Sequence, residues 1–565
     1  MKVSDYIADF LYTQGVRHVF EVTGGMVAHL IDSIHRRGKI ELISMHHEQA
    51  AAFAADGAAR MTGIPGVALA TSGPGATNLL TGIGSCFFDS VPAVYLTGQV
   101  NRDEQKGSRQ VRQLGFQETD IVSVAGPLTK AAWQARSPEE IPRLLENAWK
   151  TALSGRQGPV LLDIPMDVQR MEVVDSVPLR TLGEPSSTAA TNASEEILDA
   201  LIKSQRPLIL AGGGVRSAQA VDLVQELATL VSTPVVNSLM GVDVLPYAHP
   251  LRVGMIGTYG NRWANLALGH CDFLLVLGSR LDIRQTGSDT VAFMKGREIH
   301  HVDCDAGEIN NRLTGCRDVV TDLHGFLVAA LQLASRRSFP ARDEWHAEVA
   351  ELKRSWPDTG ELRGIPGINP NHFMRELAFS SPTASAFVVD VGQHQMWAAQ
   401  SLQLRRLQRF ITSGGMGAMG YALPAAIGVS LASHRQPVVM IAGDGGFQLN
   451  IQELETVAHH RLPIKMIIVN NRSYGMIRQF QDSYFDKRYA SSCWGYSAPA
   501  FAEIAKAYGV SSCTISSVSE INKALAWLWR DPCAPNLLEV VIDIQADAVP
   551  KIAFGGSVVD MEPRA

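Results

Sequence analysis

The sequence is poor in charge and in paired cysteines for its length. Asp, Glu, Lys and Arg make up 19% of its 565 residues, whereas globular domains usually carry about 25%. No run of Lys or Arg stands out and the net charge is −6, which argues against a nucleic acid as partner. The seven cysteines are scattered without a CxxC pair. We therefore expect neither a disulfide framework nor a zinc cluster. We expect the protein to work in a reducing compartment, the cytoplasm.

Uninterrupted apolar runs are also missing. Residues 61–88 and 410–433 lack charges, but Gly and Pro break both stretches, and a backbone facing lipid could not satisfy its hydrogen bonds there. The first segment carries Asp5 and Asp9 and predicts an amphipathic helix rather than a secretory signal. We expect no membrane partner.

Short apolar segments alternate with helical patterns along the chain. Segments such as PVLLDIP, RPLILAG and PIKMIIVNN are apolar at successive positions, which is typical of parallel strands covered by helices on both faces. The expected fold class is therefore α/β, with three doubly wound parallel-sheet domains. Polar, Pro-rich segments at 173–192 and 336–371 separate them. The expected domains are 1–172, 190–340 and 368–550, followed by a tail at 551–565.

The strongest chemical signal lies in the third domain. One strand ends in GDG at 443–445, and a second ends in NN at 470–471, after twenty-four intervening residues. Ligands bind at the carboxyl ends of strands in open α/β sheets. A carboxylate and an amide oxygen suit Mg²⁺, and glycines let backbone N–H groups approach a phosphate. Each turn alone is an ordinary strand-to-turn junction, but the pair at this spacing predicts a metal–phosphate site.

This pattern resembles the metal–diphosphate motif of thiamine diphosphate (ThDP) enzymes, and nearly the whole chain is similar to the acetohydroxyacid synthase family. The resemblance implies ThDP, Mg²⁺ and FAD as cofactors, bound by pyrimidine-binding, central FAD-binding and diphosphate-binding domains. It implies Mg²⁺ ligands at Asp444, Asn471 and the main-chain oxygen of Ser473. Met419, or else Met416, would hold ThDP bent. The residues so implied for ThDP are Val391, Gln393, His394, Gly417, Met419, Gly443, Asp444, Gly445, Gly446, Asn471, Ser473, Tyr474, Gly475, Met476 and Ile477.

A second signal is HHEQ at 46–49, where Glu48 opens a segment of small residues after the strand KIELISM. Such a glutamate is most often a solvated or capping carboxylate. The resemblance makes it the family's catalytic glutamate, which hydrogen-bonds the aminopyrimidine and helps move a proton. It also places the TSGPGATN loop, Gln99, Phe116 and Gln117 at the active site. Because Glu48 of one subunit would reach ThDP of another, a homodimer or homotetramer is implied.

In the middle domain, three glycines follow the strand RPLILA. They are a weak signal that could equally be a plain turn. The segments NSLMG, GMIGTYGNRWAN, GSRLDIRQTG, HVDCDAGEIN and TDL then follow in the order of the family's FAD-binding elements. Arg suits a diphosphate, and Asp suits ribose or adenine donors. The residues implied for FAD are Arg156, Gly212, Gly213, Gly214, Ser238, Leu239, Gly254, Met255, Gly278, Arg280, Asp282, Arg284, Asp303 and Asp322.

The acceptor side departs from the family's biosynthetic members. The loop from Gln99 to Phe116 is longer, Met166 stands where the family has Lys, and Phe480 stands where it has Trp. Met166 and Phe480 would line the acceptor pocket. Loss of the lysine charge makes a 2-keto acid acceptor less expected, although Arg284 remains to meet a carboxylate. By its overall sequence, its VRQLGFQETDIV loop and these acceptor-side changes, the chain resembles the pyruvate-dependent carboligases of branched-chain (yersiniose-type) sugar biosynthesis.

The function predicted from the sequence is therefore a carboligase. It would decarboxylate pyruvate and transfer the activated acetaldehyde unit to a ketone, a nucleotide-linked 4-keto-deoxysugar, giving a branched tertiary alcohol. One alternative is acetolactate or acetohydroxyacid synthesis with a 2-keto acid acceptor. Two others are a pyruvate-oxidase-like flavoenzyme and a non-catalytic protein of the same fold.

Overall fold

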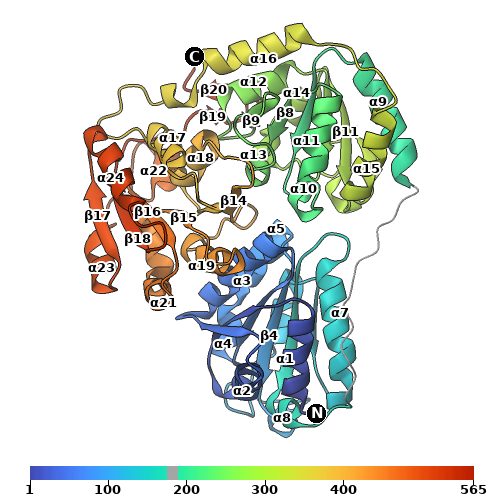
Figure 1. Ribbon diagram of the computed structural model, residues 1–565, viewed down its shortest axis with the longest axis vertical. Coiled ribbons are helices and arrows are strands. Elements are labelled where there is room, and N and C mark those ends of the chain that lie inside the picture. Colours follow the sequence, from blue (N-terminus) through green and yellow to red (C-terminus); the bar gives the residue numbers. More distant parts are fainter. Residues whose placement is uncertain (175–188, 565) are drawn as a thin grey trace.

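The computed structural model describes residues 1–174 and 189–564 and consists of three lobes (Figure 1). Each lobe is built on its own six-stranded sheet, and the strand pairs within these three sheets are parallel. In β3 (Gly66–Ala70), Val67 and Leu69 pack into one apolar core and Ala68 and Ala70 into another. The strands are apolar on both faces because helices cover both. The predicted α/β class is confirmed.

The first lobe has the strand order β2-β1-β3-β4-β6-β5. Its other strands are β1 (His18–Val22), β2 (Glu41–Ser44), β4 (Ala93–Gln99), β5 (Ala131–Gln134) and β6 (Pro159–Pro165). Its helices are α1 (Val3–Thr13), α2 (Ala28–Arg37), α3 (Glu48–Thr62), α4 (Pro74–Asn78), α5 (Leu80–Asp89), α6 (Ile121–Ala125), α7 (Ile141–Leu153) and α8 (Met166–Arg170).

The second lobe has the strand order β12-β11-β10-β7-β8-β9. Its strands are β7 (Pro207–Ala211), β8 (Val235–Asn237), β9 (Arg252–Met255), β10 (Phe273–Leu277), β11 (Glu298–Asp303) and β12 (Arg317–Val320). Its helices are α9 (Ala189–Lys203), α10 (Gly214–Ser217), α11 (Val221–Leu230), α12 (Arg262–His270), α13 (Ile283–Thr286), α14 (Thr290–Met294), α15 (Leu323–Ala334) and α16 (Asp343–Ser355).

The third lobe has the strand order β14-β13-β15-β16-β18-β17. Its strands are β13 (Ala386–Val389), β14 (Arg409–Thr412), β15 (Val438–Gly443), β16 (Ile464–Asn470), β17 (Ser511–Ile515) and β18 (Asn536–Val541). Its helices are α17 (Pro370–Ser380), α18 (Gln393–Ser401), α19 (Ala422–Ala432), α20 (Asp444–Phe447), α21 (Leu454–His459), α22 (Gly475–Tyr484), α23 (Phe501–Ala507) and α24 (Ile521–Leu528).

The segments expected to separate the lobes behave differently. Most of 173–192 lies outside the described residues. The stretch 336–371 contains α16, whose Trp345 indole donates a 3.0 Å hydrogen bond to the carbonyl of Pro207 in the second lobe. The chain after the third sheet forms a small hairpin of β19 (Lys551–Ile552) and β20 (Met561–Glu562). This hairpin packs on the second lobe, where Ile552 N donates to Thr258 O at 2.8 Å.

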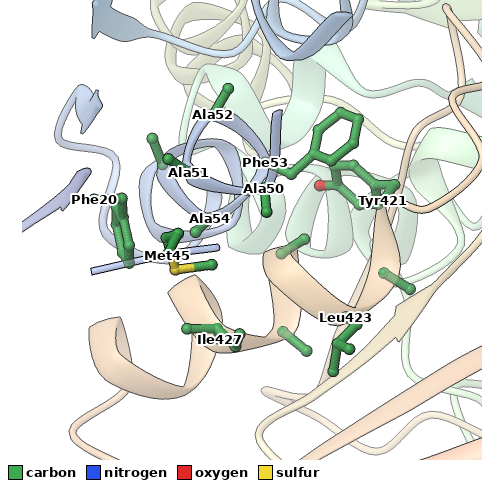
Figure 2. Close-up of a cluster of buried hydrophobic side chains, with 14 of the residues drawn as sticks. Phe20, Met45, Ala50, Ala51, Ala52, Phe53, Ala54, Tyr421, Leu423 and Ile427 are labelled. Atoms are coloured by element: carbon green, nitrogen blue, oxygen red, sulfur yellow. The ribbon is translucent and has the colours of Figure 1, made fainter. Parts of the chain in front are cut away.

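Helices α3 and α19 join the first lobe to the third. Both are rich in alanine, and their backbones approach so closely that a methyl group on Gly57 or Gly428 would overlap a carbonyl of the other helix. Figure 2 shows Phe53 of α3 beside Tyr421 at the start of α19, with ring centres 5.3 Å apart. This close contact sets the position of α3, and with it that of Glu48, against the third sheet.

Membrane-spanning helices are not found among residues 1–174 and 189–564, since none of the helices there has both the length and the apolar character needed.

Candidate active site

Strands β13, β15 and β16 are neighbours in the third sheet and run parallel, so their carboxyl ends meet at one edge. We call this the diphosphate edge; it consists of the turns 390–394, 443–446 and 471–475. The turns touch: a Cβ added to Gly443 would lie 2.9 Å from Nδ1 of His394, and one added to Gly446 would lie 3.1 Å from the carboxylate of Asp390. The structure thus brings the predicted residues of the GDG and VDVGQH segments together.

The two asparagines of the NN pair have different partners. Asn470 Nδ2 donates to Glu539 Oε1 at 2.8 Å and so braces β16 against β18. Asn471 Nδ2 instead donates to Gln393 Oε1 at 3.1 Å, and its Oδ1 accepts a 3.2 Å bond from Ser473 N. Only the second asparagine of the pair lies at the diphosphate edge, as the predicted metal set requires.

Glycines keep this edge open. A side chain on Gly475 would overlap Oε1 of Gln393 and come 2.6 Å from Nδ2 of Asn471, and one on Gly445 would overlap the ring of Tyr474. Such contacts leave room for backbone N–H groups but for no Cβ atom. This is the geometry in which a backbone approaches a phosphate closely.

Three buried polar atoms at the diphosphate edge have no hydrogen-bond partner in the protein. They are Nε2 of His394, Oδ2 of Asp444 and Oγ of Ser473. An unsatisfied buried polar atom costs about 1–3 kcal/mol, so three in adjoining turns indicate a ligand. Burial raises the pKa of Asp444 to about 6, although the nearby Tyr496 hydroxyl and backbone N–H groups favour the charged carboxylate. Burial lowers the pKa of His394 to about 3, so its ring is neutral near pH 7.

The predicted metal ligands, which are Asp444, Asn471 and the Ser473 carbonyl, suit a divalent cation with an attached diphosphate. No cluster of three or more His, Cys, Asp or Glu suited to a metal occurs in the described part of the chain. One carboxylate, one amide oxygen and one carbonyl leave coordination positions open, which phosphate oxygens fill at typical Mg²⁺ sites.

Sequence reasoning missed Asp390, which lies directly after β13. Its buried carboxylate accepts bonds from Val391 N at 2.7 Å and Gly420 N at 3.0 Å. Burial raises the pKa of Asp390 to about 7 in spite of these backbone donors. Asp390 therefore ties the first turn of the edge to the segment 413–421. The sequence signal was present, since Asp390 is the first polar residue after the apolar run AFVV.

Of the predicted residues outside the three turns, some lie close to the diphosphate edge and others lie on the surface. Gly417, with φ of +68°, is close to Val391, since a Cβ added there would be 3.9 Å from Val391 Cγ1. Met419 is half-buried on the same segment and Met476 is half-buried on α22. Ile477 and Phe480, also on α22, are 54% and 52% exposed. The structure thus leaves Ile477 and Phe480 on the surface of this chain.

Glu48 begins α3 at the edge of the first sheet and is buried. Its Oε2 accepts a 2.9 Å bond from Nδ2 of Asn78, the last residue of the TSGPGATN loop. A Cβ on Gly75 would lie 3.2 Å from Glu48 Oε1, and one on Gly73 would lie 3.0 Å from the Gln117 side chain. The structure therefore brings Glu48, the TSGPGATN loop and Gln117 together.

The remaining acceptor-side predictions are less uniform. Gln99 is buried, and its Nε2 donates to Thr119 O at 2.8 Å and to Asp163 Oδ2 at 3.1 Å. The amide thus braces the sheet. Phe116 is 79% exposed. Met166 begins α8 where β6 ends, in the first lobe, whereas Phe480 lies on α22 of the third.

A cavity of about 1220 Å³ lies where the three lobes meet, with walls from each of them. Twelve of the fourteen residues predicted for FAD line it: Arg156, Gly213, Gly214, Ser238, Leu239, Met255, Gly278, Arg280, Asp282, Arg284, Asp303 and Asp322. The other two lie behind the wall. A Cβ on Gly212 would overlap Gly278 O, and one on Gly254 would lie 2.7 Å from Asn261 Oδ1.

Some of the charged side chains at this cavity form ion pairs with one another. Arg156 of the first lobe pairs with Glu308 and Asp305 of the second. Arg280 Nε donates to Asp282 at 2.9 Å. Arg284 has no ion-pair partner within the described residues. A smaller pocket of about 340 Å³, lined by Arg280, Asp282, Ile283, Arg284, Arg312, Gly414, Gly415, Met416 and Gly417, adjoins the cavity.

Comparison with known proteins assigns the chain to a family. Models of the thiamine pyrophosphate enzyme N-terminal TPP binding domain, central domain and C-terminal TPP binding domain match residues 1–124, 194–330 and 390–540. The chain is 36% identical to the acetolactate synthase large subunit of Lactococcus lactis subsp. lactis (strain IL1403), over 98% of this chain and 94% of that protein. It is 35% identical to the acetolactate synthase isozyme 2 large subunit of Escherichia coli (strain K12), over 99% of both.

A plant relative is equally similar: acetolactate synthase 1, chloroplastic, of Oryza sativa subsp. japonica is 35% identical over 99% of this chain and 87% of that protein. Full-length similarity of this degree, and the placing of the GDG, NN and HHEQ residues at two sheet edges, agree with the predicted resemblance. The chain belongs to the thiamine diphosphate-dependent enzymes, as a member of the acetolactate synthase-like family.

Proposed function

We propose that this enzyme binds ThDP and Mg²⁺ at the diphosphate edge and decarboxylates pyruvate to form a new C–C bond. The unpartnered atoms of His394, Asp444 and Ser473 are the observation that carries this proposal. Asp444, Asn471 and the carbonyl of Ser473 would hold Mg²⁺, and His394 would donate to the diphosphate. When bound, ThDP supplies the carbanion chemistry that pyruvate decarboxylation needs.

Glu48 is proposed as the group that holds and moves a proton at the aminopyrimidine. Asn78 fixes one of its oxygens, so the carboxyl group points in one direction. In the proposed assembly this pyrimidine belongs to ThDP of a second subunit, and the protein is a homodimer or homotetramer. Gln117 lies beside Gly73, and its own φ is +65°, a rare conformation for a non-glycine residue. Such strained backbone is often found at functional sites, which supports a place for Gln117 near the substrates.

FAD is proposed for the central cavity. Twelve of the fourteen predicted residues line it, and its volume of about 1220 Å³ suits a dinucleotide better than a small metabolite. The cavity meets all three lobes, so an occupant there would hold them together. We propose the lobes as domains at 1–172, 190–340 and 368–550, with the tail at 551–565.

The acceptor is proposed to be a 2-keto acid, so that pyruvate as acceptor gives acetolactate. The relatives named acetolactate synthase support this reading over the sugar acceptor predicted from the sequence. Arg284, which lines both pockets and has no ion-pair partner in the described chain, could meet the acceptor's carboxylate. Donor specificity and acceptor specificity then depend on different residues.

A phosphorylated keto-sugar is the second candidate because of one feature, the loop 100–117. Its two sides are tied to Glu118, whose carboxylate accepts bonds from Lys106 N at 2.6 Å and Leu114 N at 2.8 Å. Between these anchors, Arg109 and Arg112 are exposed and form no ion pair with the described residues. Of the residues that the structure describes, Arg109 bonds only to backbone carbonyls of the same loop, and two such cations without a carboxylate partner there would suit the phosphates of a nucleotide-linked acceptor.

Product analysis tests the proposed function. Purified protein is incubated with ThDP, Mg²⁺, FAD and pyruvate, with and without cyclohexane-1,2-dione as a ketone. Acetolactate as the main product in both reactions supports the 2-keto acid acceptor, and tertiary alcohol in excess of acetolactate supports the ketone acceptor. Bleaching of the flavin absorbance by pyruvate at the rate of turnover would favour an oxidase. The absence of both products, without any bleaching, would contradict the carboligase.

A further inference from the structure

The segment 413–421 belongs to the third lobe by sequence, yet the first lobe holds it in place. Ser413 Oγ lies 3.1 Å from Ser85 Oγ on α5. At the other end of the segment, the Tyr421 hydroxyl donates to Asp56 Oδ1 on α3. Between these two points the segment carries Gly417 and Met419, which adjoin the diphosphate edge. Its conformation therefore depends on side chains of the first lobe.

Asp89 makes the strongest of these contacts. It is the last residue of α5, and its side chain is 2% exposed. One carboxylate oxygen accepts a 2.6 Å bond from Gly415 N, and the other accepts bonds from Gly414 N at 3.1 Å and from Arg60 at 2.8 Å. Hydrogen bonds to a charged group are about twice as strong as neutral ones. Asp89 thus fixes two successive peptide groups of the segment.

Arg60 holds the Asp89 carboxylate in turn. Its guanidinium also donates to Asp56 Oδ1 at 2.6 Å. Burial opposes the charge of Arg60, but Asp56, Tyr421 and Asp89 raise its pKa well above the ordinary value. Arg60 therefore stays charged at any pH the protein meets. If the carboxylate of Asp89 turned away from the segment, Arg60 would lose its bond to Asp89 and keep only its bonds to Asp56.

Steric contacts leave Gly414 and Gly415 little freedom. A Cβ on Gly415 would lie 2.8 Å from Asp89 Oδ1 and 2.9 Å from Phe88 Cβ, and one on Gly414 would overlap Met240 Sδ of the second lobe. The pair is clamped between α5 and the second lobe, at the wall of the central cavity that it shares with Asp89. A shift of this pair would be passed on to Gly417 and Met419, two to five residues further along.

We propose that Asp89 is a positioning residue for ThDP: by holding the peptide groups of Gly414 and Gly415 it sets Gly417 and Met419 against the cofactor. This inference rests on the proposed function. Asp89 acts through the segment and touches neither the metal turn nor Glu48. Its substitution should therefore change how tightly ThDP binds more than how fast the bound cofactor reacts.

The test compares Asp89→Asn with a matched variant, Asp272→Asn. Asp272 also accepts bonds from two successive backbone amides, Gln205 N at 2.9 Å and Arg206 N at 3.0 Å. It precedes β10 and so lies at the amino end of the second sheet, opposite the cavity. Binding of ThDP is titrated by protein fluorescence at saturating Mg²⁺ and FAD, with melting temperature measured in parallel.

We expect Asp89→Asn to raise the dissociation constant for ThDP by about tenfold or more, the loss typical of a charge-assisted hydrogen bond. The kcat at saturating ThDP should change by less than about threefold, since the reacting groups remain. Asp272→Asn should lower the melting temperature without weakening ThDP binding. Asp89→Glu keeps the charge facing Arg60 but displaces the carboxylate from both amides, so it should weaken ThDP binding as well.

The proposal is wrong if both Asp89 variants bind ThDP as the wild type does, or if Asp272→Asn weakens binding as much as they do. A fall in kcat with unchanged ThDP affinity would also overturn it. If the wild-type protein itself fails to bind ThDP with Mg²⁺, the proposed function fails instead, and the two failures are thus told apart.

Discussion

The diphosphate edge and the loop 100–117 are held by the protein in opposite ways. At the edge, Asp444 and Asn471 are 3% and 7% exposed, and neighbouring glycines leave no space for a side chain. In the loop, Phe116 is 79% exposed and the backbone is tied down at its two sides through Glu118. Packing fixes the first region before any ligand arrives. In the proposed function the packed edge serves the donor and the less constrained loop faces the acceptor, so acceptor choice should be easier to alter than donor chemistry.

The largest effect is expected at the buried edge. Asp444→Ala removes the carboxylate whose Oδ2 has no protein partner, and Mg²⁺ should be lost together with ThDP because each supplies ligands for the other. We expect ThDP affinity to fall at least about a hundredfold, beyond the 10–100-fold typical of residues that only support metal ligands. Isothermal titration with ThDP and Mg²⁺ measures this.

Asp318→Ala is the control for that variant, because Asp318 is exposed on β12, an edge strand of the second sheet. It should bind ThDP as the wild type does. Retention of Mg²⁺ and ThDP by Asp444→Ala at micromolar cofactor would remove Asp444 from the metal site, and would make the buried edge no more decisive than the loop.

Glu48→Gln should have the next largest effect, and on rate rather than binding. Glutamine keeps the shape of the side chain and can still bond to Asn78, but it cannot take up a proton. Loss of general acid–base help typically costs about 10²–10⁴-fold. Exchange of the C2 proton of bound ThDP, followed by NMR in D₂O, should slow by that factor while ThDP stays bound. Wild-type exchange in this variant would contradict the role of Glu48.

The fold and the diphosphate edge could be predicted because local residues determine them. Apolar runs such as AFVV and PVVMIAG require strands covered on both faces, and parallel strands bring their carboxyl ends to one edge. The order β14-β13-β15-β16 then places the turn after each strand beside the next. Position at the strand ends was enough to bring Asp444 and Asn471 together, whereas His394 was placed with them by the family resemblance.

Contacts between lobes could not be predicted in this way. Asp89 sits at an ordinary helix end, and its partners Gly414 and Gly415 lie in the third lobe, 325 and 326 residues away in sequence. Within the third lobe, the bond from Gly420 N to Asp390 joins two separate segments and was missed for the same reason. The side chains of α22 are a second example, because the spacing of residues along a helix does not predict which of its faces another lobe will cover. Phe480 was placed in the acceptor pocket by resemblance, and it lies on the surface of this chain.

A third experiment tests the rigidity of the edge without removing a ligand. In Gly475→Ala, the added methyl group would overlap Oε1 of Gln393 and break its bond to Asn471. Small-to-large changes in packed sites typically cost about 1–3 kcal/mol, so ThDP affinity should fall about tenfold. Gly126→Ala is the matched control, because Gly126 has φ of −45° and no atom within 4 Å of a Cβ. Equal ThDP affinity in the two variants would show that the edge is adjustable like the loop.

The smallest effect is expected at the loop, in the double variant Arg109→Ala/Arg112→Ala. Ion pairs made by exposed side chains contribute at most about 1 kcal/mol and are screened by salt. If a phosphorylated acceptor uses these arginines, its KM should rise no more than about fivefold, and the rise should shrink at high ionic strength. The rate of acetolactate formation should not change. Arg143→Ala, on exposed α7 surface, is the control. A salt-independent loss much larger than this would mean that ligand binding buries the loop, and the contrast with the diphosphate edge would then hold only for the free protein.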